Sequence, residues 1–93
     1  MKVLHWSSRY KRSFKRLVKH QSALQEKILF SMMLLEQNPF EGSLRTHKLK
    51  GEFEGMWACS VEYDLRILFE FVNDANNNEE ILLIDIGTHD EVY

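Results

Sequence analysis

The apolar positions near the N-terminus recur with the spacing of an α-helix. Between residues 10 and 18 they lie at i, i+4, i+7 and i+8, as Tyr10, Phe14, Leu17 and Val18. This spacing gathers them into one stripe, so it predicts a helix with one buried face. The polar pair Ser7-Ser8 just ahead can cap that helix, and residues 3–6 are a short strand candidate.

A second helical pattern follows after a short polar break. Its wide apolar face is formed by Leu24, Ile28, Met32 and Leu35. Ser22, with Gln25 three residues later, has the form of a capping box, and Asn38-Pro39 ends the pattern. Because the break between the two patterns is so short, we expect an antiparallel helical hairpin.

The second half of the chain changes to the alternating period of β-strands. A basic run at residues 44–50, then residues 57–63 and residues 66–72, each alternate between two faces. Residues 81–86 are apolar except for Asp85, which is typical of a strand covered on both faces.

Turn residues separate these strands. Gly51 and Gly55 bracket a short turn segment, Asp64-Leu65 makes a tight turn, and the polar tract 73–80 reads as an exposed loop. The order of elements is therefore β-α-α-β-β-β-β. We predict an α+β fold with the helical hairpin packed on a twisted antiparallel sheet, in one domain spanning residues 1–93, because 93 residues leave no room for a second core.

Composition excludes several classes of protein. The chain is 44% hydrophobic and 28% charged, which is ordinary for a globular domain. A single cysteine, Cys59, cannot form an internal disulfide and suits a reducing compartment. The N-terminus lacks the apolar segment of a signal peptide, and no apolar run approaches the length of a membrane span. We expect a cytoplasmic protein that does not bind membranes.

Charge is distributed unevenly along the chain. Residues 1–50 hold eleven Lys and Arg against three acidic residues, whereas residues 51–93 hold one basic residue against eleven acidic ones. The exposed face of the first helix carries much of this basic charge, at Arg9, Arg12, Lys15, Arg16 and Lys19 among others. No acidic residue precedes Glu26, so intrahelical ion pairs do not account for the basic residues. The face is either merely solvated, or it binds phosphates or an acidic partner.

Titratable residues gather at the end of the last strand. Thr88, His89, Asp90, Glu91 and Tyr93 directly follow the apolar run and Gly87. A rigid strand would hold them in fixed positions, as catalytic groups require. His5 and His20 are weaker candidates for catalytic groups, and we interpret them as structural or exposed. The four histidines and Cys59 lack the paired spacing of zinc ligands, so we expect no metal site.

Four sequence features carry a resemblance to a known family. They are the His47-x-Leu49-x-Gly51 run, Gly55-x-Trp57, the run Tyr63-Asp64-Leu65-Arg66-Ile67-Leu68-Phe69, and the ending Ile86-Gly87-Thr88-His89-Asp90-Glu91-Val92-Tyr93. These features resemble those of the RelE/ParE toxin superfamily, and most closely its YafQ-like branch. With the order of elements, the resemblance covers nearly the whole chain. It implies a RelE-like fold and a toxin of a type II toxin-antitoxin module. Members of the RelE and YafQ branches are endoribonucleases that cut mRNA, usually on the ribosome.

The resemblance also implies roles for individual residues. His47, Asp64, His89 and Tyr93 match active-site positions of the YafQ branch, and Arg66 matches the strand arginine that RelE-like and YoeB-like members use on the phosphate. Cleavage of RNA by these groups requires acid-base catalysis and charge stabilisation, without a cofactor. Basic residues beside His47 are expected to hold flanking phosphates, and they are Arg45, Lys48 and Lys50.

The expected partner is an acidic, partly disordered antitoxin that binds the basic helix face and the site, with operator DNA bound only through that complex. The sequence departs from the YafQ pattern at three positions: a histidine falls at Ser60, a tryptophan at Leu65 and an arginine at Asp85. These departures favour one alternative to the nuclease, a catalytically decayed module kept for antitoxin binding and operator autoregulation. The other alternative is a ParE-like inhibitor of DNA gyrase, against which the pair His47 and His89 argues, because that mode needs no acid-base pair.

Overall fold

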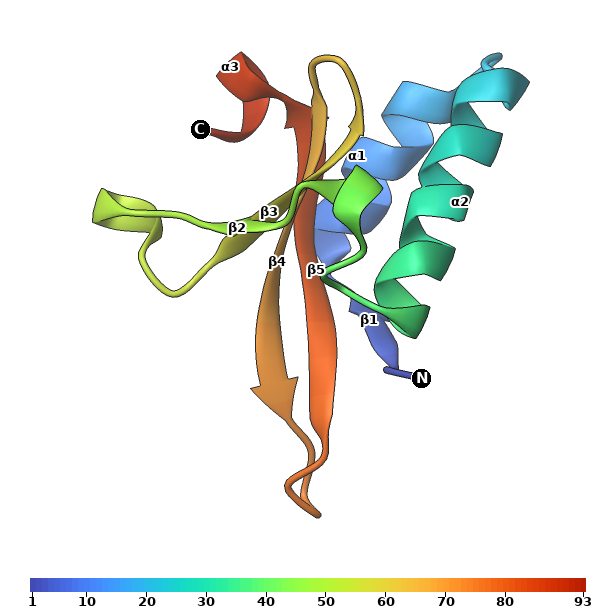
Figure 1. The fold of residues 1–93 in the computed structure, drawn as a ribbon. Helices are drawn as coiled ribbons and strands as arrows, with labels where there is room; N and C mark the ends of the chain where they lie inside the picture. Colours follow the sequence, from blue (N-terminus) through green and yellow to red (C-terminus); the bar gives the residue numbers. More distant parts are fainter.

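A five-stranded sheet forms the centre of the computed structural model, which describes residues 1–93 (Figure 1). The strands lie in the order β1-β5-β4-β3-β2. Their bounds are β1 Leu4–Trp6, β2 His47–Lys48, β3 Trp57–Glu62, β4 Leu65–Asn73 and β5 Glu79–Thr88. The α+β class and the predicted order of elements are confirmed.

The predicted antiparallel sheet contains one parallel pair of strands. β2, β3, β4 and β5 form the expected antiparallel meander, but β1 pairs with β5 in parallel, with Leu4 opposite Ile81 and Trp6 opposite Leu83. The sheet is therefore mixed. Alternation of side chains identifies each strand, but it does not set the direction of a pair whose strands come from opposite ends of the chain.

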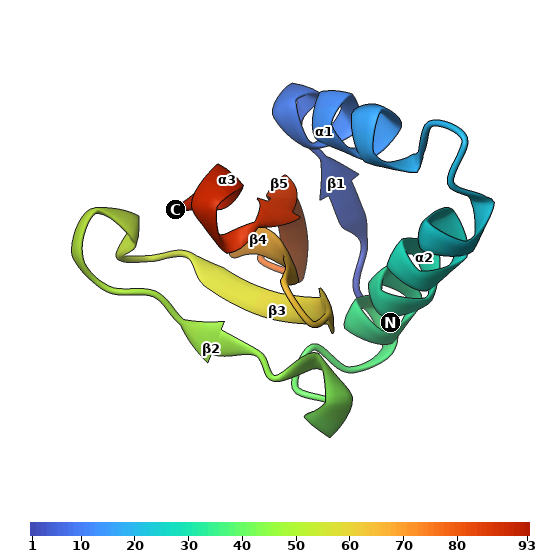
Figure 2. The ribbon, with the colours of Figure 1, turned by 90° about the horizontal axis from the view of Figure 1, so that it is seen from above.

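The two long helices, α1 (Ser8–Val18) and α2 (Ser22–Gln37), lie on the same side of the sheet, and this confirms the helical hairpin (Figure 2). Ser7 caps α1 as predicted, since its Oγ accepts a hydrogen bond from the backbone N–H of Tyr10. The capping box predicted at Ser22 is wrong. Ser22 is already the first residue of α2, and its N-cap Gln21 makes no side-chain capping bond. The chain turns sharply just before, at His20, whose φ is 60°.

The main core lies between the helices and the sheet. Tyr10, Phe14, Ile28, Met32 and Leu35 from the helices pack on β3, β4 and β5 residues that include Cys59, Ile67, Phe69, Ile81 and Leu83. Fully burying a side chain of this size contributes about 1.5–3 kcal/mol. Burial also raises the pKa of the Cys59 thiol to about 12, so this cysteine is an inert core residue.

β5 is only partly covered on its second face, contrary to the prediction. Ile81 and Leu83 are fully buried in the core, whereas Leu82 and Ile84 on the other face are only partly buried. The pairing with β4 shifts between Leu68 and Phe69. A β-bulge of this kind redirects the following side chains.

A smaller apolar cluster lies on the sheet face opposite the long helices. It consists of Ala58, Leu68 and Val92, with Tyr93 packed against them. Val92 belongs to α3 (His89–Val92), a single helical turn that the sequence did not predict and that lies across the sheet from α2 (Figure 2). A capping box formed by Thr88 and Glu91 starts α3.

Two short 3-10 turns complete the structure, at Gly42–Leu44 and Gly51–Phe53. The turn predicted between Gly51 and Gly55 is confirmed, and both glycines have positive φ angles, 68° and 95°. None of the helices combines the length and apolar character that crossing a membrane would require.

Candidate functional site

Four of the five predicted catalytic residues meet where β4 begins and β5 ends. An Arg66 guanidinium nitrogen lies 3.2 Å from Nδ1 of His89 and 3.7 Å from a carboxylate oxygen of Asp64. The rings of His89 and Tyr93 contact edge to face, with centroids 4.5 Å apart. The register explains this meeting, because Arg66 pairs with Gly87 and so lies beside the start of α3.

The Tyr93 ring connects the members of this cluster. The Arg66 guanidinium lies 5.9 Å from its centroid, within the range of a cation–π contact. The Tyr93 hydroxyl is buried and has no hydrogen-bond partner. Burial raises the pKa of Tyr93, and the nearby Arg66 partly opposes that shift. The phenol therefore stays protonated at neutral pH and is available as a donor.

His47 is separated from the other four residues by β3. It pairs with Ala58 on β3, which in turn pairs with Leu68 on β4, so His47 lies on the same sheet face as the cluster of Ala58, Leu68 and Val92. Ordinary strand spacings put its Cα roughly 12 Å from that of Arg66. Its Nδ1 lies 2.9 Å from the backbone carbonyl oxygen of Arg45. Because a carbonyl only accepts, Nδ1 carries the proton and leaves Nε2 of a neutral ring free to accept.

The predicted RNA-binding cations lie beside two cavities. Arg45 and Arg66 line one of about 400 Å³ together with Ser60. Lys48 and Lys50 line another of about 510 Å³, where the Lys48 ammonium lies 5.5 Å from the centroid of the Trp57 ring. The first cavity therefore combines a predicted RNA-binding residue with a predicted catalytic one.

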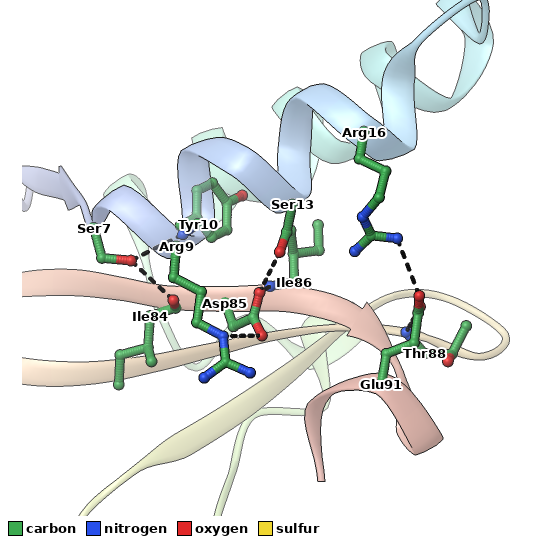
Figure 3. A network of polar contacts seen from close by, with 10 residues as sticks. All are labelled: Ser7, Arg9, Tyr10, Ser13, Arg16, Ile84, Asp85, Ile86, Thr88 and Glu91. Atoms are coloured by element: carbon green, nitrogen blue, oxygen red, sulfur yellow. Dashed lines mark hydrogen bonds and ion pairs between the residues drawn. The ribbon is translucent and has the colours of Figure 1, made fainter.

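The basic face of α1 divides into two groups. Arg12, Lys15 and Lys19 are exposed and form no ion pair. Arg9 and Arg16 instead reach the C-terminal part of the chain, where they pair with Asp85 at 3.0 Å and with Glu91 at 3.1 Å (Figure 3).

Asp85 is the centre of a polar network that ties α1 to β5 (Figure 3). One carboxylate oxygen accepts from Ser13 Oγ at 2.6 Å and from the backbone N–H of Ile86 at 2.9 Å, while the other meets Arg9. The buried hydrogen bonds of Asp85 give this residue a supporting role. The position of Arg9 was missed, because no pattern links a helix residue to a strand 76 residues later.

Glu91 holds the first turn of α3 in place. Its carboxylate accepts a 2.8 Å hydrogen bond from the backbone N–H of Thr88 and another from Arg16 (Figure 3). The Thr88 bond is the main reason that the pKa of Glu91 lies below its ordinary value. The structure contains no group of three or more His, Cys, Asp or Glu side chains placed to hold a metal ion.

The fold occurs in solved toxin structures. YafQ from E. coli strain BL21(DE3) superposes with a TM-score of 0.79 at 18% sequence identity, covering 100% of this chain and 99% of that one. A YoeB/ParE toxin from Agrobacterium tumefaciens gives 0.78 at 20% identity, covering 96% and 99%. YafQ in the E. coli DinJ-YafQ toxin-antitoxin complex gives 0.77 at 20% identity, covering 99% and 97%.

None of the curated proteins matches the chain in sequence. The family model for the bacterial toxin of type II toxin-antitoxin systems, YafQ, matches residues 2–93. That match covers nearly the whole chain, including the cluster of Asp64, Arg66, His89 and Tyr93. The chain therefore belongs to the YafQ family of type II toxins.

Proposed function

We propose that this toxin is an endoribonuclease that cuts mRNA by acid-base catalysis and so stops translation. The observation that carries the proposal is the contact between Arg66 and His89, which sets a permanent cation beside a titratable ring. Asp64 and Tyr93 complete the group. Such a set supplies the proton transfer and charge stabilisation that phosphodiester cleavage needs.

Arg66 and Arg45 would bind the scissile phosphate. The two arginines line the same cavity, and guanidinium groups bind phosphate oxygens in pairs of hydrogen bonds. Lys48 at the end of β2 and Lys50 just after it continue the cationic surface and would hold flanking phosphates. Asp64 keeps Arg66 oriented through their ion pair.

We assign the base to His47 and the acid to His89. The free Nε2 of His47 takes the proton of the 2′-OH, whose oxygen bonds to phosphorus while the P–O5′ bond breaks. His89 gives a proton to the departing 5′-oxygen, leaving a 2′,3′-cyclic phosphate and a 5′-hydroxyl. In the free enzyme His89 Nδ1 accepts from Arg66, because a guanidinium group can only donate. When Arg66 turns to the phosphate, Nδ1 becomes free to take a proton from solvent water, and His89 then gives this proton to the 5′-oxygen.

The partner that neutralises the toxin would be an acidic antitoxin on α1. Arg12, Lys15 and Lys19 offer it unpaired cations on an exposed helix face. The related E. coli YafQ was solved in complex with DinJ, and a YoeB toxin from Staphylococcus aureus in complex with YefM. Opposite charge on the two surfaces would speed their association. We infer that operator DNA is reached only through such a complex, and that mRNA is cut on the ribosome.

Induction in cells tests the nuclease. We expect wild type to arrest growth and to create new 5′ ends in mRNA, and His89→Ala to do neither. His20→Asn is the matched control, because His20 is exposed outside the site and asparagine accepts its positive φ. Growth arrest by both wild type and His89→Ala, with transcripts intact, would instead favour gyrase inhibition. No arrest by either would favour the decayed module.

A further inference from the structure

A second recess adjoins the catalytic cluster, because Tyr93 belongs to both. It is a cavity of about 350 Å³ whose walls include the rings of Phe53 and Tyr93 and the side chain of Leu68. The two rings have centroids 5.8 Å apart and are tilted at 59°. Tyr93 thus contacts His89 and Arg66 and also lines this recess.

The polar part of the recess is acidic. Arg9 contributes one positive charge, against the carboxylates of Asp85, Asp90 and Glu91. These carboxylates repel phosphate, in contrast to the cavity beside Ser60, which is lined by two arginines and one carboxylate, Glu62. An apolar recess with aromatic walls and an acidic rim suits a flat, uncharged group that carries hydrogen-bond donors.

Four charged side chains line the recess, Arg9, Asp85, Asp90 and Glu91, and three of them already have partners. Asp85 and Arg9 bind each other, and Glu91 binds Thr88 and Arg16. The Asp90 carboxylate forms no hydrogen bond and no ion pair, so it is the free acceptor of the recess. It can accept from an exocyclic amino group of adenine, cytosine or guanine. Uracil offers only its ring N3–H, which lies between two carbonyl oxygens that repel a carboxylate.

We propose that this recess is a nucleobase site, in which Phe53 and Tyr93 hold the base next to the scissile phosphate and Asp90 selects bases that bear an amino group. This inference rests on the proposed nuclease function. RNA-binding proteins hold unpaired bases against aromatic side chains. Tyr93 contacts Arg66 and also lines the recess. A phosphate bound at Arg66 therefore brings the base of a neighbouring nucleotide to the recess.

Mapping of cleavage sites across cellular mRNA tests the proposal. We expect wild type to disfavour uracil at one fixed position beside the cut. Asp90→Ala removes the acceptor. The preference for the other three bases over uracil at that position should therefore fall about tenfold, while cutting continues. Phe53→Ala removes a stacking surface and lowers the yield of cuts about tenfold or more. Glu52→Ala is the matched control, because Glu52 is an exposed neighbour of Phe53 that does not line the recess.

The outcomes separate this inference from the function on which it rests. No new ends from wild type overturns both. Cuts whose base frequencies are the same in wild type, Asp90→Ala and Phe53→Ala overturn the base site and leave the nuclease standing. Asp90 is exposed, so its variant tests the recess even if Phe53→Ala loses stability, which circular dichroism melting of each purified variant shows.

Discussion

Arg66 and His89 are 23 residues apart in the chain, yet a guanidinium nitrogen of the first lies 3.2 Å from Nδ1 of the second. The antiparallel pairing of β4 with β5 creates this contact, because Arg66 lies opposite Gly87 and α3 begins two residues later. The arginine donates, so the contact fixes His89 Nδ1 as the acceptor. The chemistry assigned to His89 depends on breaking this bond when phosphate binds.

The assignment of His89 as the acid predicts a selective rescue. Replacing the 5′-oxygen of the leaving group by sulfur removes the need for a proton, because a thiolate departs unaided. We expect His89→Ala to lose about 10²- to 10⁴-fold in the cleavage rate of an ordinary substrate. The same variant should recover most of that loss on the 5′-thio substrate, measured in single-turnover reactions with purified toxin and ribosomes.

His47→Ala is the counterpart in this experiment. It lacks the proposed base, so its deficit should be as large on the 5′-thio substrate as on the ordinary one. If both variants recover equally, the division of roles between the two histidines is wrong. If the two patterns are exchanged, His47 is the acid.

Gly87 sets the distance between β5 and α3. A Cβ at this position would lie 3.1 Å from Cβ of Glu91 and 3.1 Å from a methyl group of Val92. We expect Gly87→Ala to push α3 outward and to separate His89 from Arg66. Cleavage should fall at least about tenfold, a loss of about 1.4 kcal/mol in transition-state stabilisation. Urea denaturation should show a fall in the free energy of unfolding that is smaller than this loss, because α3 is a single terminal turn.

Gly42→Ala provides the control for that substitution, because a Cβ there would meet nothing within 4 Å. Its cleavage rate should equal that of wild type. A Gly87→Ala variant with full activity would show that α3 tolerates the displacement, and that the position of His89 does not depend on this glycine.

The Asp85 network predicts a loss of stability. In Asp85→Ala, the buried Ser13 hydroxyl and the backbone N–H of Ile86 lose their acceptor. We expect the free energy of unfolding in urea to fall by about 2–4 kcal/mol, since each unsatisfied buried group costs about 1–3 kcal/mol. Asp85→Asn keeps an acceptor and should lose less.

Arg9→Ala is the comparison that isolates the ion pair. The Arg9 side chain is 66% exposed, so solvent screens its attraction to Asp85 and the expected loss is below about 1 kcal/mol. A larger loss in Arg9→Ala than in Asp85→Ala would show that the charge pair, and not the buried hydrogen bonds, joins α1 to β5.

Periodic patterns of apolar residues were sufficient to predict individual helices and strands. The stripe from Tyr10 to Val18 became α1, and the alternation of Ile67 and Phe69 became the buried face of β4. Ser7 was a correct cap because capping depends only on neighbouring residues. The helical start at Ser22 was wrong by one position, because Gln21 takes the cap without a side-chain bond.

These local patterns could not predict contacts between residues that are far apart in the chain. The resemblance to toxins implied Asp64, Arg66, His89 and Tyr93 as a group, and the structure brings them together. It also implied His47, which the structure sets apart on β2. Nothing in the sequence indicated that Arg9 would reach Asp85, because this contact depends on how α1 crosses β5. The parallel pairing of β1 was hidden for the same reason.

Glu91 predicts how the stability of the site depends on pH. Its pKa is lowered in the folded protein, mainly by the hydrogen bond from the Thr88 backbone N–H. A carboxylate whose pKa is lowered by folding stabilises the folded state at pH values above its unfolded pKa, about 4.3. That stabilisation disappears as pH falls through the lowered folded pKa. Wild type should therefore melt at a higher temperature than Glu91→Ala at pH 7, and the difference should shrink from about pH 4 downward.

Glu91→Gln separates the capping bond from the charge. Glutamine can still accept from Thr88, so this variant should melt between wild type and Glu91→Ala at pH 7 and should change little with pH at this position. The measurement is a series of thermal melts of the three proteins from pH 7 to pH 3. A gap between wild type and Glu91→Ala that stays constant to pH 3 would contradict the prediction, because it would trace the stabilisation to packing of the side chain. A closing gap would instead identify the ionised carboxylate as the group that holds α3, and with it His89 and Tyr93, against the sheet.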